Sequence, residues 1–180
     1  PRDGIDLDAL DDVLREGGVK ACALVTNYSN PLGAVMDDDK KRALVDLLAF
    51  HDVPLVEDDI YGELSFDGPR PRAVKAFDRD GRLLHSSPFS QTISPGFRIG
   101  WTIPGQHRED VMLFKNLTSI SSSSIPQMAL AAYLKEGGYD RQLRTLRRTY
   151  RDNLARFLAA LGRYFPEGTR ATQPSGGQLL

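Results

Sequence analysis

The sequence predicts an α/β protein, and three observations lead to that prediction. Short apolar runs at 20–26 and 53–56 have the length and composition of buried strands. A segment with helical spacing of leucines, 37–51, separates them, and a crossover of this kind lets two strands pair in parallel. Hydrophobic residues make up 41% of the 180 residues, which is enough to build a core.

The other elements follow in chain order from the same patterns. Apolar residues three and four positions apart predict helices, and continuous apolar runs bounded by turn residues predict strands. We expect helices over 6–16, 37–51, 105–117, 125–136 and 140–164, and strands over 20–26, 53–56, 83–87 and 98–104. Because the run at 20–26 is apolar and continuous between Lys20 and Thr26, we expect that strand to be buried on both faces.

The longest predicted helix, 140–164, is amphipathic. Its apolar stripe consists of Leu143, Leu146, Tyr150, Leu154, Phe157 and Leu161. Arginines occupy the other face, at positions 144, 148, 151 and 163. We interpret them as a solvated face, because the whole chain has 23 basic and 24 acidic residues and gives no electrostatic reason to expect nucleic-acid binding.

Composition also limits the classes of protein and site. No apolar run is long enough to span a membrane, and the three histidines have no metal-ligand spacing, so we expect neither membrane insertion nor a metal site. One cysteine, Cys22, and no visible leader favour a cytoplasmic location. The chain starts at Pro1 without methionine and ends at 176–180 in what reads as the start of a strand, so we expect a piece of a longer protein.

Polar clusters follow three of the predicted strands. They occupy 30–33, 58–61 and 86–98. In an open parallel sheet, ligands bind in the crevice outside the carboxyl ends of the strands. We therefore expect the three clusters to converge on one ligand site.

These clusters carry a family resemblance. Residues 30–33 (NPLG), 58–61 (DDIY) and 89–100 (FSQTISPGFRIG) resemble successive motifs of the class I/II aminotransferases of fold type I, which depend on pyridoxal phosphate. The similarity is greatest to the aminotransferase-like domain of GntR/MocR-type transcriptional regulators. The resemblance implies a three-layer sandwich with a mixed, mostly parallel sheet flanked by helices, present here in part. It also implies that 1–138 belong to the large cofactor-binding domain and that 139–180 form the interdomain helix and the start of a small α+β domain.

The resemblance implies roles for four side chains toward pyridoxal phosphate. Asp58 lies against the pyridine nitrogen, where a carboxylate keeps the ring protonated. Asn30 and Tyr61 donate hydrogen bonds to the phenolic oxygen of the ring. Arg98 binds the phosphate, which suits the geometry of a guanidinium group.

Two positions depart from the family pattern. Gln91 stands where the family has the catalytic lysine that forms the Schiff base, and an amide can neither form that bond nor carry a proton near neutral pH. Pro88 stands where the family supplies a Ser or Thr hydroxyl to the phosphate. Ser87 and Ser90 are the candidates to replace that hydroxyl, and we assign Ser90 to the cofactor site. Gln91 argues against transaminase activity of this chain.

Four functional hypotheses remain open at this point. The first is the cofactor- or effector-sensing domain of a GntR/MocR-type regulator, with an amino acid or 2-oxo acid ligand, a homodimeric parent protein, and DNA bound only through an upstream domain. The second is a free-standing aminotransferase that transfers an amino group from an amino acid to a 2-oxo acid. The third is a cofactor-free remnant that serves dimerisation. The fourth is that Gln91 was introduced by mutagenesis to trap a substrate complex.

Overall fold

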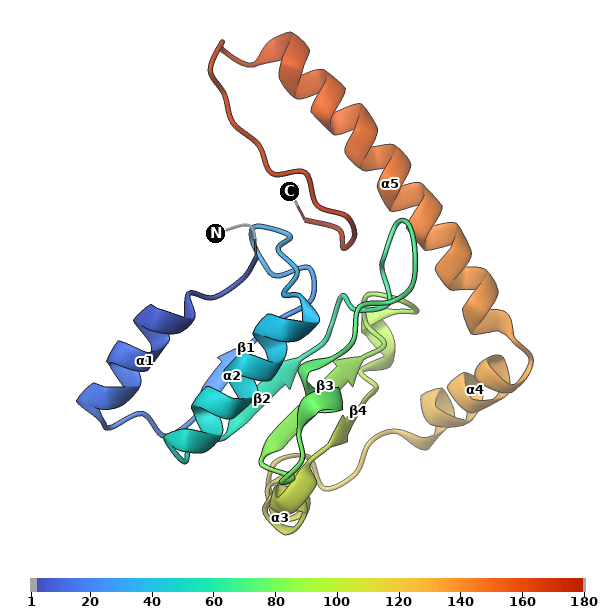
Figure 1. Ribbon diagram of the computed structural model, residues 1–180. Helices are drawn as coiled ribbons and strands as arrows, with labels where there is room; N and C mark the ends of the chain where they lie inside the picture. The colour runs from blue at the N-terminus through green and yellow to red at the C-terminus, as the bar shows by residue number, and fades with distance from the viewer. Residues whose placement is uncertain (1–2, 180) are drawn as a thin grey trace.

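The sheet at the centre of the molecule has four strands. The computed structural model describes residues 3–179, and Figure 1 shows the arrangement. The strands, in spatial as well as chain order, are β1 (Cys22–Leu24), β2 (Leu55–Asp58), β3 (Leu83–Pro88) and β4 (Gly100–Ile103). The first three are parallel, and β4 runs antiparallel to β3. The predicted α/β class, with a mixed and mostly parallel sheet, is confirmed.

Five α-helices accompany the sheet in the described residues. They are α1 (Leu7–Glu16), α2 (Asp38–Phe50), α3 (Arg108–Ser119), α4 (Ser124–Lys135) and α5 (Gly138–Tyr164). Short 3-10 turns cover Val74–Phe77, Pro95–Phe97 and Gly105–His107. The last of these turns takes up the first residues of the helix predicted over 105–117, so α3 begins later than expected. Its position in the chain is otherwise as predicted.

The first two helices begin at aspartate caps. The Asp6 carboxylate accepts hydrogen bonds from the backbone N–H groups of Asp8 and Ala9, and Asp37 accepts one from Lys40 at 2.7 Å. These side chains satisfy backbone donors that have no partner inside the helix. Both helices therefore start where the acidic residues in the sequence indicate.

The main core lies between α1, α2 and one face of the sheet (Figure 1). Leu44 and Leu48 of α2 are buried against Leu55 of β2 and Leu83 of β3. Burial of apolar side chains of this size contributes about 1.5–3 kcal/mol each. This packing holds the parallel strands in register under α2.

The prediction that the first strand is buried on both faces is wrong. β1 has only three residues, and Ala23 in its middle is exposed while Cys22 and Leu24 are half-buried. Within the described residues β1 is the edge of the sheet, and it hydrogen-bonds to β2 alone. An apolar run in the sequence indicates that its side chains favour burial. How much of their surface is buried depends on the helices and strands that pack against them.

The long helix α5 runs beside the sheet, and the segment after it turns back toward the loop that follows β1 (Figure 1). Leu143 of its predicted stripe is buried and Leu146 packs beside it, whereas Phe157 is half exposed. The strand expected over 176–180 is present only as one isolated antiparallel bridge between Ser65 and Gly176, and Leu180 lies outside the described residues. The division of the chain at residue 138 stays a prediction.

The described helices also bear on membrane insertion. Across residues 3–179, none combines the length and the apolar character that a membrane crossing requires.

Candidate functional site

The three polar clusters lie at the carboxyl end of the parallel strands. The loops at 25–36, 59–73 and 89–99 follow the carboxyl ends of β1, β2 and β3, and parallel strands place these ends together. The backbone N–H of Asp59 donates to the Ser86 carbonyl at 2.9 Å, which ties the second loop to the third strand. The topology thus agrees with the placement that the sequence predicts.

Asp58 is the last residue of β2, and its side chain is exposed. Partial burial raises the pKa of its carboxyl, and the neighbouring Asp59 raises it further. No ion pair or hydrogen bond joins the Asp58 carboxylate to another side chain within 3–179, and the nearby backbone N–H of Ile60 acts to lower its pKa. A cationic ligand group beside it would favour its charged form.

Tyr61 lies three residues further along the same loop. Its ring is buried in a second apolar cluster with Tyr28, Leu64 and Leu143. Its hydroxyl makes no hydrogen bond within the part of the chain that the structure describes, and it is not among the enclosed unpaired polar atoms there. The ring is therefore held in place while the hydroxyl stays open to a ligand.

Asn30 is exposed in the loop after β1, directly before a cis peptide bond to Pro31. It lines a hollow of about 350 Å³ together with Ala34 and Met36. Its amide also has no hydrogen-bond partner among residues 3–179.

Ser90 and Gln91 line a different hollow, of about 300 Å³, beside α5 residues that include Leu146 and Tyr150. The side-chain oxygen Oε1 of Gln91 accepts a hydrogen bond from the side-chain Nε2 of Gln178 at 2.7 Å. The Ser90 hydroxyl has no such partner in the described chain. Gln91 therefore contacts the C-terminal segment, whereas Ser90 stays available.

Arg98 follows the 3-10 turn between β3 and β4 and is exposed. Its backbone is left-handed, with φ 51°, a conformation that few residues other than glycine adopt readily. Phe89 donates its N–H to the Ile99 carbonyl at 3.0 Å, which brings the backbone on either side of Ser90 and Arg98 together in space. No carboxylate pairs with the guanidinium in the region from residue 3 to residue 179.

Pro88 ends β3, opposite Gly100 of β4. Ser87 is buried, and its hydroxyl donates to the Asp59 carbonyl at 3.3 Å. Ser87 is therefore not free to replace the missing phosphate-binding hydroxyl, which leaves Ser90 as the candidate.

The structure brings the predicted site residues to the carboxyl end of the parallel strands, but it does not place all of them in one cavity. Asn30 and Gln91 line separate hollows. The available groups are nevertheless those that pyridoxal phosphate requires: a cation for its phosphate, a carboxylate for its ring nitrogen, and an amide and a hydroxyl for its phenolic oxygen. The donor set fits non-covalent binding of this cofactor, and Gln91 does not fit a covalent link.

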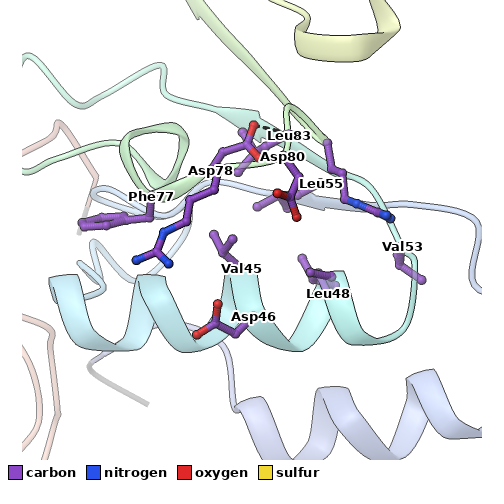
Figure 2. Close-up of a pocket in the computed structure, with 12 residues that line it drawn as sticks. Val45, Asp46, Leu48, Val53, Leu55, Phe77, Asp78, Asp80 and Leu83 are labelled. Atoms are coloured by element: carbon purple, nitrogen blue, oxygen red, sulfur yellow. Dashed lines mark hydrogen bonds between the residues drawn. The ribbon is translucent and has the colours of Figure 1, made fainter.

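Another cavity, of about 290 Å³, lies at the opposite end of the sheet (Figure 2). Its apolar wall includes Leu48 of α2 and Leu55 of β2, and acidic side chains such as Asp46 and Asp80 stand around it. None of the predicted cofactor-contacting residues lines this cavity.

A buried polar network lies beneath the three loops, and the sequence patterns did not predict it. Its members are polar or charged and almost fully buried: Thr26, Asn27, Lys41, Glu57, Asp59 and His85. Asp59 accepts hydrogen bonds from Asn27 at 3.0 Å and from Arg70, and Asn27 accepts one from Lys41 at 2.7 Å. The acidic run at 57–59 was the one signal that could have led to it.

Glu57 is the centre of a second group of contacts in this network. Burial alone would raise the pKa of its carboxyl, but hydrogen bonds from His85 at 2.8 Å and from the Val74 N–H at 2.7 Å, together with those from Thr26 and Lys75, lower it overall. The Glu57 carboxylate is therefore charged in the folded protein and anchors the start of the 74–77 turn to β2.

Comparison with known proteins assigns this arrangement to a family. Residues 1–179 match the sequence profile described as aminotransferase class I and II. The chain belongs to this family. It is 43% identical over 182 residues to the HTH-type transcriptional regulator YjiR of Escherichia coli strain K12, and the match covers all of this chain and 38% of the regulator. The predicted resemblance to aminotransferase-like domains of regulators is confirmed.

Two solved aminotransferases of the family share the fold closely. The kynurenine aminotransferase of Pyrococcus horikoshii, solved in complex with PMP, matches with a TM-score of 0.91 and 30% identity over 98% of this chain and 45% of its own. The α-aminoadipate aminotransferase LysN of Thermus thermophilus, complexed with N-(5'-phosphopyridoxyl)-L-leucine, matches with a TM-score of 0.91 and 28% identity over 98% of this chain and 46% of its own. Pyridoxal phosphate is thus the cofactor of the family, as predicted. The chain spans less than half the length of these relatives.

Proposed function

We propose that this chain is part of the sensing domain of a GntR/MocR-type regulator, which binds pyridoxal phosphate without a covalent link and responds to an amino acid or 2-oxo acid. The proposal rests on a difference between the predicted site residues and their buried polar neighbours in hydrogen bonding and ion pairing. Within residues 3–179, no other side chain forms a hydrogen bond or ion pair with the side chains of Asn30, Asp58, Tyr61, Ser90 and Arg98, whereas the buried polar side chains beside them are paired. Unpaired groups of complementary charge at one sheet edge are what a polar ligand requires.

Each of these side chains has one role in this proposal. Arg98 binds the phosphate through its guanidinium, and Ser90 adds a hydroxyl to the same group. Asp58 accepts a hydrogen bond from the ring nitrogen and holds a proton there. Asn30 and Tyr61 donate to the phenolic oxygen. When bound, pyridoxal phosphate supplies an aldehyde that reacts with amines and a ring that withdraws electrons.

Gln91 directs the proposal toward sensing and away from catalysis. Its amide has no nucleophilic amine, so it cannot hold the cofactor covalently or move a proton to and from a substrate carbon. Non-covalent binding through Arg98 and Asp58 needs no lysine. The cofactor aldehyde would therefore stay available to an incoming amine.

The similarity to regulators supports the wider part of the proposal. At 43% identity, YjiR is more than twice as long as the matched region. We infer that the parent protein is a cytoplasmic homodimer that binds DNA through a separate upstream domain. The present chain would supply ligand recognition.

Calorimetric titration of the full-length protein with pyridoxal phosphate tests the proposal. We expect binding in the micromolar range, and no covalent pyridoxyl adduct after borohydride reduction. The Gln91→Lys variant should form that adduct, because a lysine amine then meets the aldehyde. If the wild-type protein binds no cofactor, the proposal is wrong and the cofactor-free dimerisation remnant is supported.

A free-standing aminotransferase is the second candidate, and the close fold match to solved aminotransferases favours it. An assay of amino transfer from a set of amino acids to 2-oxoglutarate separates the two. We expect no turnover by the full-length wild-type protein, because no lysine is present at position 91. Turnover above the rate of free pyridoxal phosphate would identify an enzyme.

A further inference from the structure

Asp59 is a buried carboxylate at the point where the three loops meet. It directly follows Asp58, but its side chain is 1% exposed while that of Asp58 is exposed. The two-residue period of the strand directs the two carboxylates to opposite sides. Asp58 therefore lies on the exposed side, and Asp59 faces the interior.

The contacts of Asp59 join the first two loops to each other and to β3. Its Oδ1 atom accepts a hydrogen bond at 3.0 Å from the Asn27 amide, three residues before Asn30 in the loop after β1. Its backbone N–H donates to the Ser86 carbonyl at 2.9 Å, and its carbonyl accepts from the Ser87 hydroxyl at 3.3 Å. A single residue thus connects the chain ends of β1, β2 and β3.

The charge of Asp59 is balanced inside this network. Its Oδ2 atom accepts a hydrogen bond from Arg70, whose Nε donates to Glu63 at 2.7 Å. Lys41, which is fully buried, contacts Asn27 at 2.7 Å and the Arg72 carbonyl at 2.6 Å. Burial lowers the pKa of Lys41, and the charges of Glu57, Asp38 and Asp59 oppose that change. Loss of the Asp59 charge would remove one of the two carboxylate partners of Arg70 and one of the negative charges that favour the charged form of Lys41.

The backbone beside Asp59 leaves space only for this arrangement. A Cβ atom at Gly62 would lie 2.3 Å from Asp59 Oδ1, closer than atoms without a bond can approach. The glycine therefore lets the loop turn tightly around the carboxylate, which places Tyr61 in its apolar cluster.

We propose that Asp59 is a positioning residue, whose carboxylate holds the loops after β1 and β2 together so that Asn30, Asp58 and Tyr61 address one ligand. This inference rests on the proposed binding of pyridoxal phosphate. Asp59 itself faces away from the ligand and acts through the loops.

The test compares the full-length wild-type protein with its Asp59→Asn variant. Calorimetry measures the affinity for pyridoxal phosphate, and visible circular dichroism at saturating cofactor reports how the protein orients it. We expect the affinity to fall at least about tenfold, a loss comparable to that on removing a supporting partner of a ligand-binding residue. The induced dichroism should also weaken at saturation, which a change in stability alone would not produce.

Two further variants complete the experiment. Asp67→Asn makes the same chemical change at an exposed carboxylate, which lies 3.4 Å from Arg151, and should leave both readouts unchanged. Asn27→Ala removes the link to the first loop while Asp59 keeps Arg70, so it decides the matter if Asp59→Asn does not fold. It too should weaken affinity and dichroism.

The possible failures are distinguishable. If the wild-type protein binds cofactor and folded Asp59→Asn matches it in both readouts, the positioning role is wrong and the proposed function stands. If Asn27→Ala folds and Asp59→Asn does not, an unchanged affinity and an unchanged dichroism for Asn27→Ala likewise show that the positioning role is wrong. If the wild-type protein itself binds no cofactor, the proposed function fails and the positioning role fails with it.

Discussion

Three consecutive acidic residues at 57–59 have two different environments. Glu57 and Asp59 are buried and paired with other side chains, and Asp58 between them is exposed and pairs with no side chain in the described part of the protein. The alternation of a strand produces this difference, because successive side chains point to opposite faces. Whether one of these carboxylates is buried or exposed therefore depends on its alternating position along the chain as much as on its residue type.

Glu57→Gln is expected to destabilise the full-length protein. The change keeps the size of the side chain but removes the charge that His85 and two backbone N–H groups face in the interior. We expect a loss of about 2 kcal/mol in the free energy of unfolding at pH 7, measured by urea denaturation. The exposed Glu16→Gln change serves as the control and should have no measurable effect.

The same pair of proteins should show a defined pH dependence. Because the folded protein lowers the pKa of Glu57, its stabilising contribution is complete above the pKa of the unfolded chain, about 4.3. It is lost as the pH falls through the lower pKa of the folded state. The stability difference between wild-type protein and Glu57→Gln should therefore stay constant from pH 7 to about 5 and decrease below about 4. A difference that grows with acid would contradict the assignment.

At the level of elements, α2 links the core to the polar network. One side of the helix buries Leu44 and Leu48 against the sheet, and Lys41 on the same helix reaches Asn27 under the first loop. A change in where α2 begins would therefore affect both the packing and the loops above it.

The cap of α2 can be tested directly. Asp37→Ala removes the oxygen that accepts the Lys40 N–H at 2.7 Å, and we expect a loss of about 1 kcal/mol in the free energy of unfolding. Asp37→Ser keeps a capping oxygen and should recover most of the loss. Equal destabilisation by Ala and Ser would show that the cap is not the cause.

At the scale of the whole molecule, the surface around β4, α3 and α4 is unusually apolar. All four residues of β4 are exposed, and large apolar side chains stand out from both helices. Examples are Leu117, 71% exposed, and Met128, 72% exposed. Large exposed apolar side chains in such number are typical of surfaces that contact further protein.

The isolated 180-residue chain is therefore expected to self-associate. Sedimentation velocity at increasing concentration should show species larger than the 20.0 kDa monomer. Combining Leu117→Lys with Met128→Lys should shift the distribution toward monomer, because both changes place charge on the apolar surface. A chain that stays monomeric at all concentrations would show that this surface drives no association.

The order of the elements, the family and the glutamine at position 91, where the family has a lysine, can be inferred from the amino-acid sequence. These features depend on the spacing of nearby residues and on motifs a few residues long, both of which can be read from the sequence alone. The tertiary structure decided which carboxylates are buried, how far β1 is covered, and that Asn30 and Gln91 line separate hollows. Contacts such as that between Asn27 and Asp59 join residues 32 positions apart. Such contacts depend on how helices and strands pack, and no local pattern in the chain encodes that packing.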